Sequence, residues 1–101
     1  MPSSGKMDGY IALDPSQDAV KDRHRTAPPA SPSVGDRYIV AAVATGLWAG
    51  KEKYIAEYSS GLSWLFTAPQ EEFNCWCDDE GVYLLYHSGS WDLLDEQIDH
   101  A

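Results

Sequence analysis

The sequence contains few of the features that cross-link a small protein or direct it to a membrane or out of the cell. Its only cysteines are Cys75 and Cys77, and no C-x-x-C pair or paired histidines are present to complete a zinc site. A spacing of two residues places both thiols on one face of a strand, so we predict buried, reduced thiols rather than a mutual disulfide, a metal site or a redox site. There is no apolar run of about 18 residues and no basic-then-apolar leader, so we expect synthesis in a cytoplasm and no membrane insertion.

Basic side chains are missing from the second half of the chain. Residues 54–101 contain ten acidic side chains and no Lys or Arg, whereas residues 1–53 contain seven basic and six acidic side chains, within a total net charge of -9. An acidic half of this kind repels phosphate backbones, so we expect no nucleic-acid partner. Two interpretations stay open: the acids keep a small β body soluble, or they attract the basic half of a neighbouring copy.

Motifs for catalysis are also missing. None of the three histidines, His24, His87 and His100, belongs to a recognisable nucleophile motif, and no carboxylate arrangement indicates a glycan hydrolase. The acidic run 78–80 lacks the spaced ligands of a calcium loop, which favours a solvated turn. We therefore expect no enzymatic activity, no cofactor and no metal ion.

Large apolar residues are scarce in the first third of the chain, where five of the six prolines occur. We interpret residues 1–25 as an extended N-terminal arm with a short helix over 15–24, because Asp14 suits the N-cap and Pro15 the first helical position. A helix of about ten residues is marginal in water and needs something to lie against. Residues 26–36 form a Pro-rich spacer, and residues 95–101 form a polar tail.

The remaining residues, 37–94, show the pattern of short β-strands. "EYSSGLSWLF" at 57–66 is repeated as "LYHSGSWDLL" at 85–94. In each copy a glycine supplies the positive φ of a tight turn, and a tyrosine faces a tryptophan across it. The predicted fold is mainly β: a small antiparallel meander or barrel of repeated β-hairpins, with five to seven strands and an extended N-terminal arm.

The chain is rich in large aromatic rings, with four tryptophans and six tyrosines. Each tryptophan ring on its own favours a place in the core (Trp48, Trp64, Trp76 and Trp91), since large aromatic side chains are buried on average. Rings of this kind also stack on sugars and anchor interfaces. Tyr58 and Tyr86, at the mouths of the hairpins, and Trp48 are therefore candidates for contact with a glycan or a partner.

Four stretches resemble a known family: "TAPPASPSVGDRYIVAA" at 26–42, "ATGLWAGKEKYIAEY" at 44–58, "WLFTAP" at 64–69 and "CWCDDEGVYLLYHSGSWDLL" at 75–94. From Thr26 to Leu94 the chain is similar to the DUF2793 domain of tailed bacteriophages, prophages and gene transfer agents. The resemblance implies a structural part of a virion, such as a head spike, a capsid decoration or a tail-fibre component. It implies no catalytic residues.

Together these observations lead to one main hypothesis and one alternative. The main hypothesis is a non-enzymatic virion protein, made in the host bacterial cytoplasm, whose arm docks on neighbouring capsid, tail or fibre subunits through Tyr10, Ile11, Leu13 and Val20. So small a body also favours a homo-oligomer, with a trimer favoured and a strand-exchanged dimer left open. The alternative is a carbohydrate-binding adhesion module that contacts host capsule or lipopolysaccharide.

Overall fold

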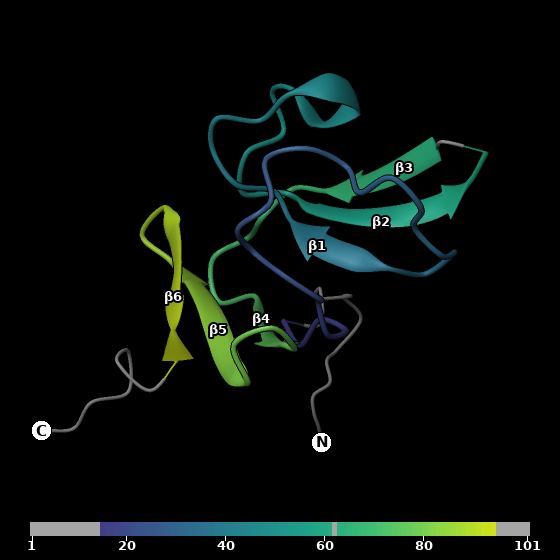
Figure 1. Ribbon diagram of the computed structural model, residues 1–101. Helices are drawn as coiled ribbons and strands as arrows, with labels where there is room; N and C mark the ends of the chain where they lie inside the picture. Colours follow the sequence, from purple (N-terminus) through teal and green to yellow (C-terminus); the bar gives the residue numbers. More distant parts are fainter. Residues whose placement is uncertain (1–14, 62, 95–101) are drawn as a thin grey trace, which may run out of the picture.

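The chain folds into two small antiparallel sheets, described by a computed structural model over residues 15–61 and 63–94. Sheet β1-β2-β3 and sheet β4-β5-β6 each join strands that follow one another in sequence (Figure 1). The elements are β1 (Arg37–Ile39), η1 (a 3-10 turn, Gly46–Trp48), β2 (Ile55–Ser60), β3 (Ser63–Thr67), β4 (Asn74–Cys77), β5 (Val82–His87) and β6 (Ser90–Leu93). The prediction of a small, mainly β meander is confirmed. In the described part of the chain, no helix has the length and apolar character to cross a membrane.

Both repeated stretches form the expected hairpins. The turn glycines have positive φ angles, 52° at Gly61 and 88° at Gly89, which residues with a Cβ rarely adopt. Tyr58 lies opposite Trp64 in the β2–β3 register, with ring centroids 5.1 Å apart. In the second hairpin, β5–β6, the corresponding tyrosine and tryptophan are also paired, at 5.4 Å. The sequence repeat therefore encodes two similar hairpins, one in each sheet.

Residues 15–26 are extended, and their first part lies along β4. Two isolated parallel bridges join this part to the strand, Ser16 to Asn74 and Val20 to Cys77. The backbone hydrogen bonds that accompany them measure between 2.7 and 3.0 Å. This part of the segment therefore adds a short parallel edge to the second sheet.

The second part of the same segment pairs with β1 of the first sheet. The backbone N–H of Lys21 donates to the carbonyl of Arg37 at 2.8 Å, and the N–H of Ile39 donates to the carbonyl of Asp22 at 3.1 Å. Figure 1 shows this segment between the two sheets. Residues 15–26 therefore connect the sheets through backbone hydrogen bonds to both.

The helix predicted over residues 15–24 is wrong, because none of these residues is helical. Asp14 and Pro15 are good helix-start signals, but local propensity is a weak determinant when strand edges offer hydrogen bonds and burial. A helix of this length is marginal in water on its own, so the strand edges have little helix stability to overcome. The extended form instead places Val20 in the core, where it is 0% exposed.

The core consists of two clusters on opposite faces of the first sheet. The inter-sheet cluster fills the space between the sheets and contains Val20, Ile39, Ile55, Phe73, Cys75, Cys77, Leu84 and Trp91. The loop-side cluster lies under the connection between β1 and β2 and contains Tyr38, Val40, Ala44, Trp48 and Ala56. Alternation along β1 and β2 sends neighbouring side chains into different clusters, so this sheet is covered on both faces.

This packing corrects the expected role of Val20. Val20 was predicted to belong to an arm that docks on another subunit, but its side chain is enclosed in the chain's own inter-sheet cluster. The part of the predicted arm from residue 15 onward is thus a component of the β body. Tyr10, Ile11 and Leu13, the other predicted docking residues, lie outside the described residues.

Replacing Val20 with alanine tests this assignment. Val20→Ala should lower the free energy of unfolding by about 2 kcal/mol, because it removes buried methyl groups and leaves a cavity between the sheets. Val34→Ala is a matched control at a side chain that is 70% exposed, and it should change the value by less than about 0.5 kcal/mol. Urea unfolding followed by tryptophan fluorescence measures both. Equal effects of the two substitutions would contradict the placement of residues 15–26 in the core.

Candidate functional site

Arginine, histidine and glutamate side chains connect the segment 15–26 to the turn between β4 and β5, and we call Arg23, His24 and Glu80 the charged cluster after its Arg23–Glu80 ion pair. Arg23 Nη2 lies 3.0 Å from Glu80 Oε1, and His24 Nε2 lies 2.6 Å from the other carboxylate oxygen. Arg23 Nη1 also donates a hydrogen bond of 2.9 Å to the carbonyl oxygen of Trp91. The hydrogen bond from His24, followed by those of the Arg23 guanidinium, holds the pKa of the Glu80 carboxyl below its usual range.

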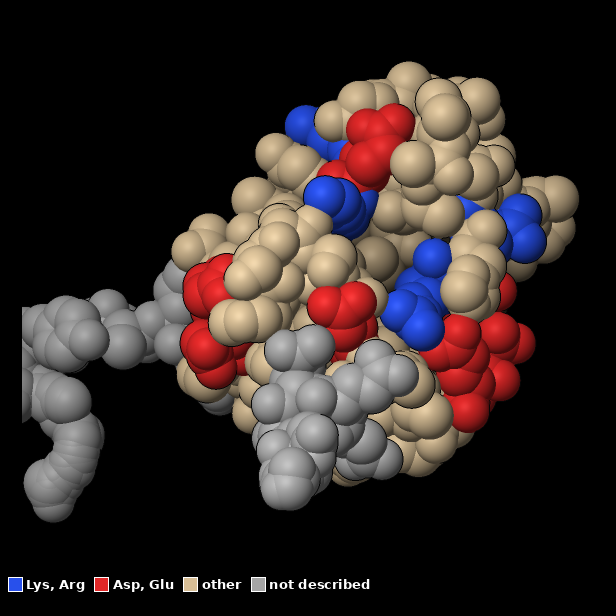
Figure 2. Space-filling model, turned by 90° about the vertical axis from the view of Figure 1, so that its left-hand side faces the viewer, with Lys and Arg blue, Asp and Glu red and all other residues tan. Residues whose placement is uncertain are grey.

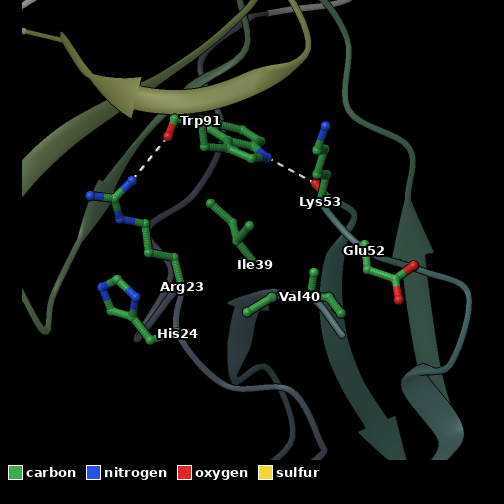
Figure 3. Close-up of a pocket in the computed structure, with 9 residues that line it drawn as sticks. Arg23, His24, Ile39, Val40, Glu52, Lys53 and Trp91 are labelled. Carbon is green, nitrogen blue, oxygen red and sulfur yellow. Dashed lines mark hydrogen bonds between the residues drawn. The ribbon is translucent and has the colours of Figure 1, made fainter. Parts of the chain in front are cut away.

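A pocket of about 250 Å³ lies beside this charged cluster, between the two sheets. Its apolar wall includes Ile39, Val40 and Trp91, and Arg23, His24 and Lys53 add polar groups (Figure 3). On one side of the molecule, Figure 2 shows basic side chains around a hollow, with acidic side chains next to them.

The polar groups of this pocket already have partners within the chain. The Lys53 ammonium donates to the carbonyl of Gly89, and Trp91 Nε1 donates to the carbonyl of Lys53 at 2.9 Å. Arg23 and His24 are held by Glu80, and in Figure 3 the Arg23 side chain points toward the Trp91 backbone. These contacts therefore favour a set of polar interactions that joins the two sheets, rather than an anion-binding site with an unpaired positive charge.

The charge imbalance of the sequence is partly used inside the chain. Arg37 Nη1 lies 2.7 Å from Glu57 Oε1, across paired positions of β1 and β2. The pair Arg23 and Glu80 likewise joins a basic residue of the first half to an acidic residue of the second. Attraction between the two halves thus operates within one copy of the chain.

The two cysteines are buried and unpaired, as predicted. Burial, with a smaller contribution from the neighbouring Cys77 thiol, raises the pKa of Cys75 to about 12. A thiol with such a pKa is protonated at neutral pH, and the thiolate is the form that attacks electrophiles or binds metal ions. Both cysteines therefore behave as small apolar core residues.

One group of side chains has the composition of a metal site. Atoms of Glu71, Glu72 and His87 that can act as ligands lie within 4.8 Å of one another. His87 Nδ1, however, lies 2.7 Å from a carboxylate oxygen of Glu71, which also accepts from the N–H of Ser88 at 3.2 Å. The contact between Glu71 and His87 is thus explained as a surface contact beside a turn. No spacing in the sequence indicates this group, because the two glutamates precede β4 and the histidine ends β5.

The three aromatic residues predicted to contact a glycan or partner are not brought together. Trp48 is fully buried in the loop-side cluster, 5.2 Å from Trp64 between ring centroids. Tyr58 lies on β2 and Tyr86 on β5, in different sheets, and each packs against the tryptophan of its own hairpin. The core position favoured for Trp48 is confirmed, and its candidate role as a contact residue is wrong, because the connection that carries it folds onto the first sheet.

A different aromatic pair is exposed. Trp76 and Tyr83 lie opposite each other on β4 and β5, with ring centroids 4.9 Å apart and planes at 70°. Trp76 was expected in the core but is 37% exposed, and Tyr83 is 55% exposed. The sequence did contain the signal, since strand alternation that turns Cys75 and Cys77 inward must turn Trp76 outward.

Comparison with protein families matches residues 11–92 to the family described as "Protein of unknown function (DUF2793)". The chain belongs to the DUF2793 family. The match begins at Ile11, whereas the stretches that resemble the family begin at Thr26, so the DUF2793 domain includes the segment 15–26 that pairs with both sheets. A search of curated proteins and a search of solved structures each found no match.

The charged cluster predicts a pH-dependent contribution to stability. Glu80→Gln keeps the shape of the side chain but removes its charge, and it should lower the free energy of unfolding of the DUF2793 chain by about 1 kcal/mol at pH 7. The pKa of Glu80 is lower in the folded than in the unfolded chain, so its contribution is complete above the ordinary value of 4.5 and is lost as the pH falls through the folded-state pKa. The difference between the two proteins should therefore shrink below about pH 4.5. Asp79→Asn removes a charge from the same turn as a control; an equal loss in that variant would show that the ion pairs of Glu80 are not responsible.

The buried thiols predict slow chemical modification. In the native DUF2793 chain at neutral pH, iodoacetamide should label Cys75 and Cys77 at least about a hundredfold more slowly than in the chain unfolded in urea, because burial excludes the reagent and keeps the thiols protonated. Mass spectrometry of the quenched reaction measures labelling. Rapid modification of the native protein would be inconsistent with the burial of these residues.

Proposed function

We propose that this DUF2793 chain is a non-enzymatic structural protein of a bacteriophage virion, in a head spike, a capsid decoration or a tail fibre. The phage context comes from the stretches that resemble the DUF2793 domain of tailed phages, prophages and gene transfer agents. In this proposal the chain acts by binding other virion proteins. Its partners are capsid, tail or fibre subunits and further copies of itself, with a trimer as the favoured homo-oligomer.

The observation that best supports a docking role is the amount of apolar surface left in water. Among the residues that the structure describes, six large apolar side chains are exposed: Val34, Val43, Leu47, Leu65, Trp76 and Tyr83. Single exposed apolar residues are normal on any protein, but aromatic residues are enriched at protein–protein interfaces. A small body also gains more from subunit contacts than a large one, because it buries a smaller fraction of its own surface.

The second element of the proposal is the segment that precedes the body. The N–H of Asn74 donates to the carbonyl of Pro15 at 2.8 Å, so the chain enters the body at a fixed place beside β4. Tyr10, Ile11 and Leu13 lie shortly before that place in the sequence. With Val20 committed to the core, we assign docking to residues 1–14, and contacts made by this segment would start at the β4 edge of the body.

The carbohydrate-binding alternative requires aromatic rings gathered on one surface. Trp48 is buried, and Tyr58 and Tyr86 lie in different sheets, so these three residues do not form such a surface. Protein docking is therefore the function that we carry forward.

Two deletions test the docking proposal. A chain without residues 1–14 should keep its fold and stability but lose incorporation into particles, because the docking segment is gone while every described contact of the body remains. A chain without residues 1–25 should fail to fold, because it also lacks Val20, Arg23 and His24. Circular dichroism measures folding, and quantitative mass spectrometry of purified particles measures copy number.

A milder variant separates the apolar contacts from the length of the segment. Replacing Tyr10, Ile11 and Leu13 together with serine should reproduce the loss of incorporation, whereas replacing Ser3 and Ser4 of the same segment with alanine serves as the control. Normal copy number in particles of the chain without residues 1–14 would refute the assignment of docking to this segment.

A further inference from the structure

We propose that the outer face of sheet β4-β5-β6 is a docking surface for a Lys- or Arg-bearing segment of a partner protein. We call it the outer aromatic face and define it by Asn74, Trp76, Tyr83, Leu85 and Asp92. The proposal deepens the function above by naming a surface on the body and the chemistry of its partner. It rests on that function only in assuming that the chain acts by docking, and it is separate from residues 1–14.

The strand register assembles this face. Tyr83 is paired with Trp76, and Leu85 is paired with Asn74 on one side and Asp92 on the other. Directly paired residues, and residues two apart on a strand, point to the same side of a sheet. The opposite side carries Cys75, Cys77, Leu84 and Trp91 into the inter-sheet cluster. The aromatic pair and its neighbours therefore face away from the core.

The surroundings of the aromatic pair are acidic. Asp78 and Asp79 follow β4 directly, in the turn between Trp76 and Tyr83, and both are exposed. Asp92 adds a carboxylate within the face itself. No Lys or Arg occurs from residue 54 to the end of the sequence, so none of these strands supplies a compensating cation. The histidine of β5, His87, is engaged by Glu71.

The basic side chains of the described first half are already engaged. Lys21, whose carbonyl accepts from the N–H of Asp79, directs its ammonium to Asp36 at 3.8 Å. The other contacts are Arg23 with Glu80, Arg25 with the Ala27 carbonyl, Arg37 with Glu57, Lys51 over the Tyr54 ring, and Lys53 with the Gly89 carbonyl. A cation that complements the outer aromatic face must therefore come from outside the described part of the chain.

Exposed rings beside carboxylates suit a cationic side chain. A guanidinium or ammonium is attracted to the face of a tryptophan or tyrosine ring and, at the same time, to nearby carboxylates. A sugar that spans two rings needs them nearly coplanar, whereas the planes of Trp76 and Tyr83 meet at 70°. Charge and ring geometry thus both favour a basic protein segment over a neutral glycan.

The test uses the full-length chain in solution, titrated with an oligoarginine peptide by isothermal calorimetry. Trp76→Thr and Tyr83→Thr should each weaken binding by about two- to fivefold, as expected for the loss of one exposed cation–π contact, without changing the charge of the protein. Leu65→Thr, which removes an exposed apolar side chain from the other sheet, is the matched control and should leave the affinity unchanged. Circular dichroism confirms that each variant is folded.

Two results would overturn the proposal. If the ring variants bind oligoarginine as tightly as the natural sequence, or if Leu65→Thr weakens binding equally, the peptide is attracted by net charge alone. If a neutral maltooligosaccharide binds more tightly than oligoarginine and competes with it, the face is a glycan site. Because no particle is involved, the titration is independent of the incorporation experiment, and either proposal can fail without the other.

Discussion

The structure depends on the backbone hydrogen bonds that residues 15–26 make to both sheets. Each sheet has only three short strands, and sheets of this size need apolar burial against a second element. The segment supplies this burial by placing Val20 between the sheets. It also brings Arg23 and His24 to Glu80, in the turn between β4 and β5. These two side chains of the segment belong to the charged cluster and form part of the pocket lining.

Local patterns were sufficient to predict the strands but not this connection. The hairpins could be predicted because alternation, turn glycines and facing aromatic residues are encoded within about ten neighbouring positions. The conformation of residues 15–24 is instead decided by β4, whose residues are far away in the sequence. Asp14 and Pro15 gave a correct local preference for a helix start, and the distant strand edge outweighed it.

The candidate surfaces show the same difference between features set by local sequence and features set by distant contacts. Exposure of Trp76 followed from the inward direction of Cys75 and Cys77, a consequence of alternation that composition-based reasoning about tryptophan overlooked. Burial of Trp48 agrees with the general preference of tryptophan for the core, but the cluster that it joins depends on how a long connection folds onto the first sheet. The charge imbalance was visible in the sequence, but its pairing, such as Arg37 with Glu57, required the register of the strands.

The parallel pairing of Val20 with Cys77 has a consequence for synthesis. A ribosome releases the N-terminal segment long before the strand that covers it, and contacts between distant positions form late. The nascent chain therefore carries an uncovered valine until β4 has been synthesised, and the first sheet lacks its inner partner until then. Any partner that recognises the finished surface consequently meets only chains in which β4 is already available for pairing.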